Sequence, residues 1–260
     1  MEFEIIFSII IPFVGTILGS ALIFIFKKLN DGILRAFSGF AAGVMVAASI
    51  FSLIIPSLEV VGDKMGKLSF IPVVVGLALG FGFLMLLDKV IPHQHTNSEE
   101  TEGPKANLKK STMTSLAVAL HNLPEGMAVG VVLASANMEG SSVPLSMAIA
   151  LAIGIAIQNF PEGAIISMPL VGEGVSKKRA FLYGSLSGIV EPIFGFVAIL
   201  LVSLISNILP YLLAFAAGAM IYVVVEELIP SSQEGKHSNL ATIGVMVGFT
   251  LMMILDIALA

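Results

Sequence analysis

Two short motifs in the chain place polar side chains at the same spacing. HNLPEG begins at His121 and QNFPEG begins at Gln158, and the two share Asn, Pro, Glu and Gly. Residues four apart lie on the same face of a helix, so His121 is expected beside Glu125, and Gln158 beside Glu162. Imidazole, carboxylate and amide groups on one face can relay protons, or they can supply nitrogen and oxygen ligands to a cation.

The other shared residues of the motifs also have predictable effects. Asn122 and Asn159 add one amide each beside the first residue. Pro124 and Pro161 lack a backbone N–H and displace the carbonyl four residues earlier, which predicts a kink that turns carbonyl oxygens into a cavity. The glycine that ends each motif would let a neighbouring helix approach closely.

A third apolar segment, GIVEPIFG, contains Glu191. An ionised carboxylate at the centre of a bilayer costs about 2.5–3.5 kcal/mol on insertion scales. Three of them close together would repel one another unless they were protonated or bound to a cation. One His, three Glu, two Asn and one Gln form a ligand set that suits Zn²⁺ and, less selectively, Fe²⁺, Mn²⁺, Co²⁺ or Cd²⁺. The predicted metal ligands are His121, Asn122, Glu125, Gln158, Asn159, Glu162 and Glu191.

Other interpretations of these groups stay open. A membrane-embedded histidine can be hydrogen-bonded to a carbonyl or serve a proton relay, and Glu191 before Pro192 can mark a kinked helix with a protonated carboxyl. Two classes of metalloenzyme are disfavoured, because H-E-x-x-H is absent and the only E-x-x-H spacing runs from Glu234 to His237. A passive metal channel would use the same ligands as a carrier.

Five further residues are weaker candidates for metal binding. Glu226 and Glu227 could form an exit-side metal station or simply a solvated helix end. His93 and His95 could collect metal in a polar connection or belong to a disordered linker. Glu59 could attract cations at an entrance or be an ordinary surface charge.

The composition indicates a membrane protein. Hydrophobic residues make up 57% of the 260 residues and charged residues only 12%, against about 25% in soluble domains, and the mean hydropathy is +1.00. Continuous apolar runs of bilayer length predict helices rather than a barrel. The sequence therefore predicts one all-α integral membrane domain over residues 1–260, with a mobile polar connection at about 93–111. The eight expected spans are 3–26, 33–58, 69–92, 112–136, 143–170, 180–206, 209–230 and 239–259.

Basic residues predict how the spans are oriented. Eleven of the 13 lie at the first, third, fifth and seventh connections, whereas only Lys64 and Lys67 lie on the other side. Because cytoplasmic loops carry the excess of Lys and Arg, both termini are expected outside. The acidic N-terminus has no cleavage site after it and is expected to be a retained first span.

Two pairs of similar segments predict an internal repeat. FAAGVMVAASIFSLIIPSLE, from Phe40, resembles FAAGAMIYVVVEELIPSSQE, from Phe215, with the Ile-Pro step displaced by one residue. GFGFLMLLD, ending at Asp88, resembles GFTLMMILD, ending at Asp256, and both aspartates are expected to anchor or cap helix ends. The orientations make this a 3+2+3 arrangement, with spans 1–3 and 6–8 as inverted repeats around spans 4 and 5, as in secondary transporters. Chance similarity between apolar helices is the alternative.

The motifs HNLPEG and QNFPEG, together with Glu191 in VEPIFG, resemble the ZIP (Zrt/Irt-like protein) family of divalent metal transporters, in particular its bacterial GufA-type branch. The resemblance covers nearly the whole chain, including EELIP in span 7. It implies a binuclear metal centre in which glutamates bridge two ions. The implied ligands are His121, Glu125, Gln158, Glu162 and Glu191 for one ion, and Asn122, Glu125, Asn159, Glu162 and Glu191 for the other.

The resemblance also implies how such a protein works and where. Spans 1, 4, 5 and 6 would move against spans 2, 3, 7 and 8 in an elevator-like alternation that carries the ion, most plausibly Zn²⁺, into the cytoplasm. Some relatives have aspartate where this sequence has Asn159, so the second site here lacks a negative charge. The resemblance predicts a homodimer in the inner membrane of a prokaryote, with no organic cofactor and no nucleic-acid partner.

Overall fold

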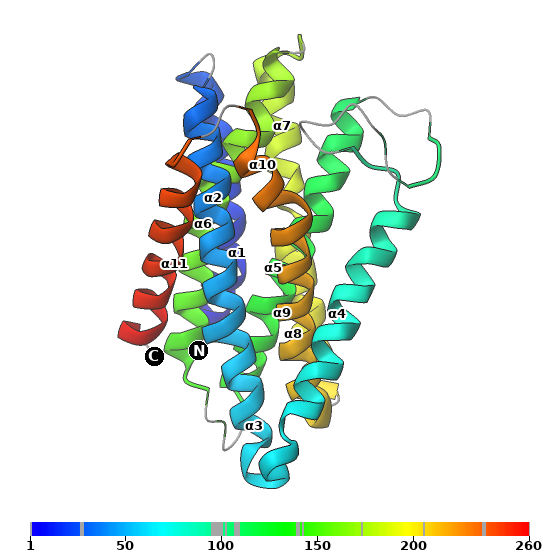
Figure 1. The fold of residues 1–260 in the computed structure, drawn as a ribbon, viewed down its shortest axis with the longest axis vertical. Coiled ribbons are helices and arrows are strands. Elements are labelled where there is room, and N and C mark those ends of the chain that lie inside the picture. Colours follow the sequence, from blue (N-terminus) through cyan, green and yellow to red (C-terminus); the bar gives the residue numbers. More distant parts are fainter. Residues whose placement is uncertain are drawn as a thin grey trace.

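The chain folds into a bundle of long helices (Figure 1). The structure is a computed structural model that describes residues 2–26, 29–94, 101, 103–106, 110–138, 141, 143–172, 174–204, 206–235 and 238–259. Within these residues, eight helical segments are long and apolar enough to cross a membrane, which confirms the all-α membrane fold class. They are Phe3–Phe24, Asp31–Gly62, Gly66–Val90, Ser115–Ala136, Leu145–Gly172, Lys177–Val202, Leu209–Gln233 and Leu240–Leu259.

Several spans are built from more than one helical segment. The α-helices are α1 (Glu2–Ser20), α2 (Asp31–Ala48), α3 (Ile55–Met65), α4 (Phe70–Val90), α5 (Lys110–Ala136), α6 (Leu145–Gly172), α7 (Lys177–Ser187), α8 (Val190–Leu204), α9 (Leu209–Val223), α10 (Ile229–Gln233) and α11 (Leu240–Leu259). The 3-10 segments are η1 (Ala21–Phe24), η3 (Gly66–Leu68) and η4 (Ser206–Ile208). Two π-helical segments are η2 (Ser49–Ile54) and η5 (Val224–Leu228).

The helices associate in four close pairs, α1 with α6, α2 with α11, α4 with α9, and α5 with α8. Glycines spaced four residues apart lie at the contact in every pair. A Cβ added at Gly15 or Gly19 of α1 would collide with the backbone of Ala156 or Phe160 in α6. Without side chains between them the backbones touch, which is how small residues drive helix packing in lipid. The equivalent glycines elsewhere are Gly39 and Gly43 in α2, Gly244 and Gly248 in α11, Gly76 and Gly80 in α4, and Gly126 and Gly130 in α5.

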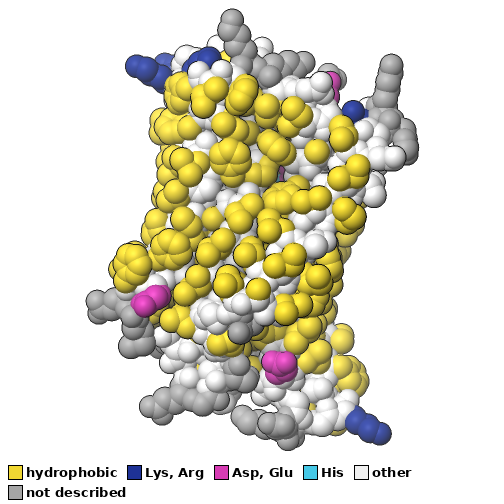
Figure 2. Space-filling view, turned by 90° about the vertical axis from the view of Figure 1, so that its left-hand side faces the viewer, with side chains coloured by type: hydrophobic (Ala, Val, Ile, Leu, Met, Phe, Trp, Pro, Cys, Tyr) yellow, Lys and Arg dark blue, Asp and Glu magenta, His cyan; other side chains and the backbone are white. Residues whose placement is uncertain are grey.

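The helix α5 is buried inside the bundle, whereas α4 and α11 are largely exposed on its outside. In the span Ser115–Ala136, which belongs to α5, 89% of the most apolar window is buried inside the protein, against 28% for Gly66–Val90 and for Leu240–Leu259. Hydrophobic side chains cover the middle of the face in Figure 2, and Lys and Arg lie at its two ends. The helix that carries HNLPEG is therefore surrounded by protein rather than hydrocarbon, as a polar motif in a membrane requires.

The two π-helical segments occupy matching places in the two similar stretches of sequence. Each follows directly on a helix that contains FAAG, and each is followed by an Ile-Pro step at the start of the next helix, with Pro56 after η2 and Pro230 after η5. Because η2 contains one residue more than η5, the one-residue displacement between the two stretches falls inside the π turn. A π turn can accommodate such an extra residue without ending the helix.

Two buried aspartates tie helices together near their ends. Asp256 of α11 accepts hydrogen bonds from Ser52 of η2, with oxygen–oxygen distances of 2.8 and 2.9 Å to its two carboxylate oxygens. Asp88 of α4 accepts one from the hydroxyl of Tyr222 in α9. Both contacts join helices that are far apart in the sequence, and they confirm that these aspartates anchor helix ends.

Candidate metal site

The seven predicted metal ligands are all buried in the interior of the bundle. The three glutamates come from three helices, Glu125 from α5, Glu162 from α6 and Glu191 from α8, and are 1%, 8% and 1% exposed. Amides from both motifs donate hydrogen bonds to them, and the imidazole of His121 is buried as well. Carboxylates so far from water need partners that offset their desolvation.

The amide of Gln158 lies between two of the carboxylates. Its Nε2 donates to Oε1 of Glu125 at 2.5 Å and to Oε1 of Glu162 at 3.1 Å. The same nitrogen lies 3.5 Å from Oδ1 of Asn159. Gln158 therefore links the two motif helices, α5 and α6, through their glutamates.

The carboxylate of Glu191 is held differently. Its Oε1 accepts hydrogen bonds from Asn122 Nδ2 at 3.1 Å and from Thr16 Oγ1 at 3.2 Å, and its Oε2 accepts one from Asn159 Nδ2 at 2.8 Å. Three neutral donors from α1, α5 and α6 thus converge on one carboxylate of α8. Glu191 also lies in the first turn of α8, where the helix dipole favours a negative charge.

Four oxygen atoms of the set have no hydrogen-bond partner among the described residues. They are Oδ1 of Asn122, Oε2 of Glu125, Oε1 of Gln158 and Oε2 of Glu162. A buried acceptor without a donor costs about 1–3 kcal/mol, and more when it is charged. A hard or borderline cation bound to such oxygens would remove that cost, so the donor set fits a divalent metal. In their present positions, no three His, Asp or Glu side chains of the described residues are close enough together to hold an ion.

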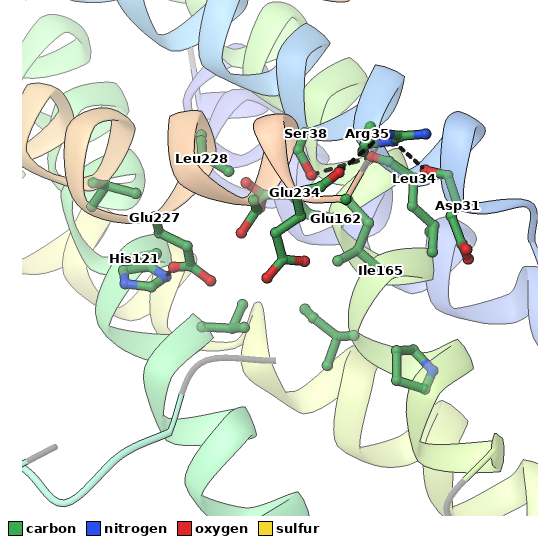
Figure 3. A pocket seen from close by; sticks show the side chains of 16 residues that line it. Asp31, Leu34, Arg35, Ser38, His121, Glu162, Ile165, Glu227, Leu228 and Glu234 are labelled. Atoms are coloured by element: carbon green, nitrogen blue, oxygen red, sulfur yellow. Dashed lines mark hydrogen bonds and ion pairs between the residues drawn. The ribbon is translucent and has the colours of Figure 1, made fainter. Parts of the chain in front are cut away.

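His121 points to a different partner from the one its sequence position suggests. Its Nδ1 contacts Oε2 of Glu227, which belongs to η5 (Figure 3). Both residues, together with Glu162, line a cavity of about 610 Å³. At its far end, Arg35 of α2 donates to the backbone oxygen of Glu234 at 3.0 Å. The cavity therefore connects Glu162, His121 and Glu227 with the ends of α2 and α10.

The glycines of the two motif helices lie at close helix contacts, as the sequence predicts. Gly126 and Gly163 allow close approach, because a Cβ at either position would meet the backbone of α8 or of α1. The helices α5 and α6 continue through Pro124 and Pro161 without a break. The kink at these prolines stays a prediction.

The weaker candidates fall in different environments. Glu227 lines the cavity, whereas its neighbour Glu226 is exposed and is absent from the cavity wall, and Glu59 of α3 is exposed at the other end of the bundle. His93, expected in a mobile loop, is fully buried instead, with Nδ1 at 2.8 Å from the oxygen of Ile91. Its Nε2 lies 3.6 Å from Oδ1 of Asp88, so the start of the connection packs against α4. His95 lies outside the described residues.

Sequence reasoning missed three groups that hold the site. Thr16 binds Glu191, the carbonyl of Pro12 accepts from Asn159 Nδ2 at 3.3 Å, and the carbonyl of Ser187 accepts from Asn122 Nδ2 at 3.3 Å. None of these groups is charged, and each is far from its partner in the sequence. The available signal in the sequence was that Pro12, which frees a backbone carbonyl, and Thr16 lie one turn apart on α1.

Comparisons with known proteins cover nearly the whole chain. The family model described as ZIP Zinc transporter matches residues 113–256. The chain is 38% identical to Zinc transporter GufA of Myxococcus xanthus over 85% of each chain, and 38% identical to Zinc transporter ZIPB of Bordetella bronchiseptica over 95% of this chain and 78% of the relative. It is 35% identical to Zinc transporter ZIP11 of Xenopus tropicalis over 94% of each chain.

These relatives are named as transporters, not as enzymes. Their similarity extends over the spans that supply the buried carboxylates and over the spans that surround them. The chain belongs to the ZIP zinc transporter family.

Proposed function

We propose that this multi-pass membrane protein carries zinc, or a similar divalent cation, from outside the cell into the cytoplasm. The observation that carries the proposal is the set of buried oxygens of Glu125, Gln158 and Glu162 that have no hydrogen-bond partner among the described residues. Glu162 also lines the cavity. Family membership supports zinc as the cargo. Cd²⁺, Fe²⁺, Mn²⁺ and Co²⁺ remain chemically compatible with the same ligands.

The cargo site proposed here uses His121, Glu125, Gln158, Glu162 and Glu191. In the present arrangement the Gln158 amide offers its N–H groups to the glutamates, and rotation of the amide would offer its oxygen to an ion instead. The second site that the resemblance implies would add Asn122 and Asn159. The residues of both proposed sites come from α5, α6 and α8, which supports binding at the middle of the membrane.

The cavity supports an inward route of release. It runs from His121 and Glu162 to Asp31 and Glu234, at the side where the basic connections place the cytoplasm. Glu227, next to His121 in the cavity wall, is proposed as the station to which the ion moves on release. Exposed Glu59, at the opposite end, is proposed to attract ions at the entrance.

The helix pairs support an elevator-like movement. Ligands lie on α1–α6 and α5–α8, whereas Glu227 lies in the span that packs against α4. The pairs are related by the proposed repeat, in which spans 1–3 correspond to spans 6–8 and span 4 corresponds to span 5. Under this correspondence α1 matches α8 and α6 matches α5, so the pair α1–α6 becomes the pair α5–α8. In the same way the pair α2–α11 becomes the pair α4–α9. This matching of pairs supports the inverted 3+2+3 repeat, in which one set of pairs moves against the other.

The membrane potential alone can drive such uptake. A divalent cation that enters a negative interior gains about 4.6 kcal/mol per 100 mV, twice the value for one charge. We place the protein in the inner membrane of a prokaryote, where this potential is present. Coupling to protons is not needed for net uptake.

Uptake of Zn²⁺ into proteoliposomes tests the proposal. His121→Ala and Glu125→Ala should each abolish or greatly reduce uptake, because each removes a ligand from the buried site. Gln233→Ala, an exposed amide at the end of α10, is the matched control and should transport as the unmodified chain does. Uptake at the control rate by both site variants would remove these ligands from the mechanism. Saturable, slow flux supports a carrier, whereas much faster flux supports a channel.

A further inference from the structure

Helix α1 contributes two polar contacts to the candidate site although it carries no charge there. The carbonyl of Pro12 accepts from Asn159 Nδ2 at 3.3 Å, and one turn further along Oγ1 of Thr16 donates to Oε1 of Glu191 at 3.2 Å. Thr16 is fully buried, and the residue it contacts is 1% exposed. The hydroxyl is therefore fixed on the carboxylate and is not shared with solvent.

The three buried glutamates differ in how many hydrogen-bond donors they have. Glu125 and Glu162 share the single amide of Gln158, and each keeps one oxygen without a donor among the described residues. Both oxygens of Glu191 have donors, from Thr16 and Asn122 on one and from Asn159 on the other. The carboxylate oxygens that are free to bind a cation therefore belong to Glu125 and Glu162 rather than to Glu191.

Gly188 packs closely against both Thr16 and Glu191. A Cβ built at Gly188 would lie 2.8 Å from Oγ1 of Thr16 and 3.0 Å from Oε1 of Glu191. Contacts this short mean that even a methyl group would displace one of the two oxygens. The carboxylate is held in place by packing as well as by hydrogen bonds.

The neutral ligands also argue against a second ion. Asn122, Gln158 and Asn159 are amides, which offer oxygen atoms but no negative charge that would offset a second dication in a buried site.

We propose that Thr16 is a positioning residue: with Asn122 and Asn159, it occupies both carboxylate oxygens of Glu191, so that the cargo site takes one cation rather than two. The inference rests on the proposed function. Among the residues of the cargo site, Glu125, Gln158 and Glu162 carry the unpartnered oxygens for the single ion. Glu191, whose two oxygens accept from the three donors, does not bridge to a second ion.

Counting bound ions in the purified full chain tests this directly. Cd²⁺ per chain is measured after gel filtration and compared with the Glu125→Ala, Glu162→Ala double variant, so that ions at surface sites cancel. The difference should be one ion for the unmodified chain and should approach two for Asn159→Asp, which restores a charged ligand. A difference of two in the unmodified chain overturns the inference and leaves the transporter proposal intact, whereas a difference of zero overturns both.

Thr16 itself is tested with two matched variants. Thr16→Val keeps the shape and loses the hydroxyl, and loss of a hydrogen bond to a charged group should lower the apparent Cd²⁺ affinity about ten- to hundredfold. Thr16→Ser keeps the hydroxyl and should stay close to the unmodified affinity. Equal affinities for the Val and Ser variants, at equal thermal stability, overturn the positioning role. The ion count of Asn159→Asp decides the matter independently if the Val variant does not fold.

Discussion

Gly126 provides the most direct test of how the ligand helices are held together. It ends the HNLPEG motif on α5 and faces the backbone of α8 at Glu191, a proposed ligand. A Cβ at this position would lie 2.6 Å from Cα and 2.8 Å from the carbonyl carbon of Glu191. Non-bonded carbon atoms approach to about 3.5–4.0 Å, so Gly126→Ala should force α5 and α8 apart by about 1 Å.

A displacement of this size should affect function more than folding. Overpacking of a tight contact typically costs about 1–3 kcal/mol in the free energy of unfolding. A misplacement of about 1 Å in a functional geometry can reduce a rate about a hundredfold. We therefore expect the initial rate of Zn²⁺ uptake by Gly126→Ala to fall by about ten- to hundredfold, while the protein still inserts.

The assay compares uptake into proteoliposomes with thermal stability in detergent. Gly82→Ala is the matched control, because Gly82 lies within α4 and an added Cβ meets nothing within 4 Å. The control should transport normally and be equally or slightly more stable, since alanine favours the helix. Normal uptake by Gly126→Ala would refute the argument that this backbone contact positions Glu191.

Two further predictions concern contacts outside the ligand set. Tyr222→Phe removes the hydroxyl that donates to buried Asp88, and the free energy of unfolding should fall by about 1.5–3 kcal/mol, measured by chemical or thermal denaturation; an unchanged stability would show that the hydrogen bond is not needed to anchor α4. Glu227→Gln replaces the carboxylate beside His121 at the start of the proposed release route, so uptake at saturating Zn²⁺ should slow about tenfold with little change in ion affinity. If affinity falls as much as the rate, Glu227 is instead a ligand of the cargo site.

The spans could be predicted from sequence because hydrocarbon imposes composition directly. A run of about 20 apolar residues has few alternatives to a membrane helix, and all eight expected runs are helical. Which helices pair was not readable from hydrophobicity, because lipid tails and leucine side chains are equally apolar. The pairs are set by glycine spacing, as at Gly39 and Gly43, and many apolar sequences contain such spacings by chance.

The candidate site was predictable to the extent that its residues are charged or repeated. Glu125 and Glu162 are conspicuous in apolar sequence, and the structure links them through Gln158. Thr16 is an ordinary residue for a membrane helix, and only the fold reveals its contact with Glu191 across 175 positions. His93 was misjudged because a polar neighbourhood suggested solvent, whereas the aspartate at the end of α4 gives it a buried partner.

The π-helical segments suggest how two halves of one chain could acquire different chemistry. An insertion in a regular α-helix rotates everything after it by about 100°, which would turn a packed face toward lipid. Within η2 and η5 the surplus residue is absorbed locally, and the Ile-Pro steps beyond keep their place. The two similar stretches therefore differ in length and in side-chain content at this point without a change in the helices around it. One copy now presents Ser52 to an aspartate and the other presents Glu227 to a histidine, with the flanking architecture preserved.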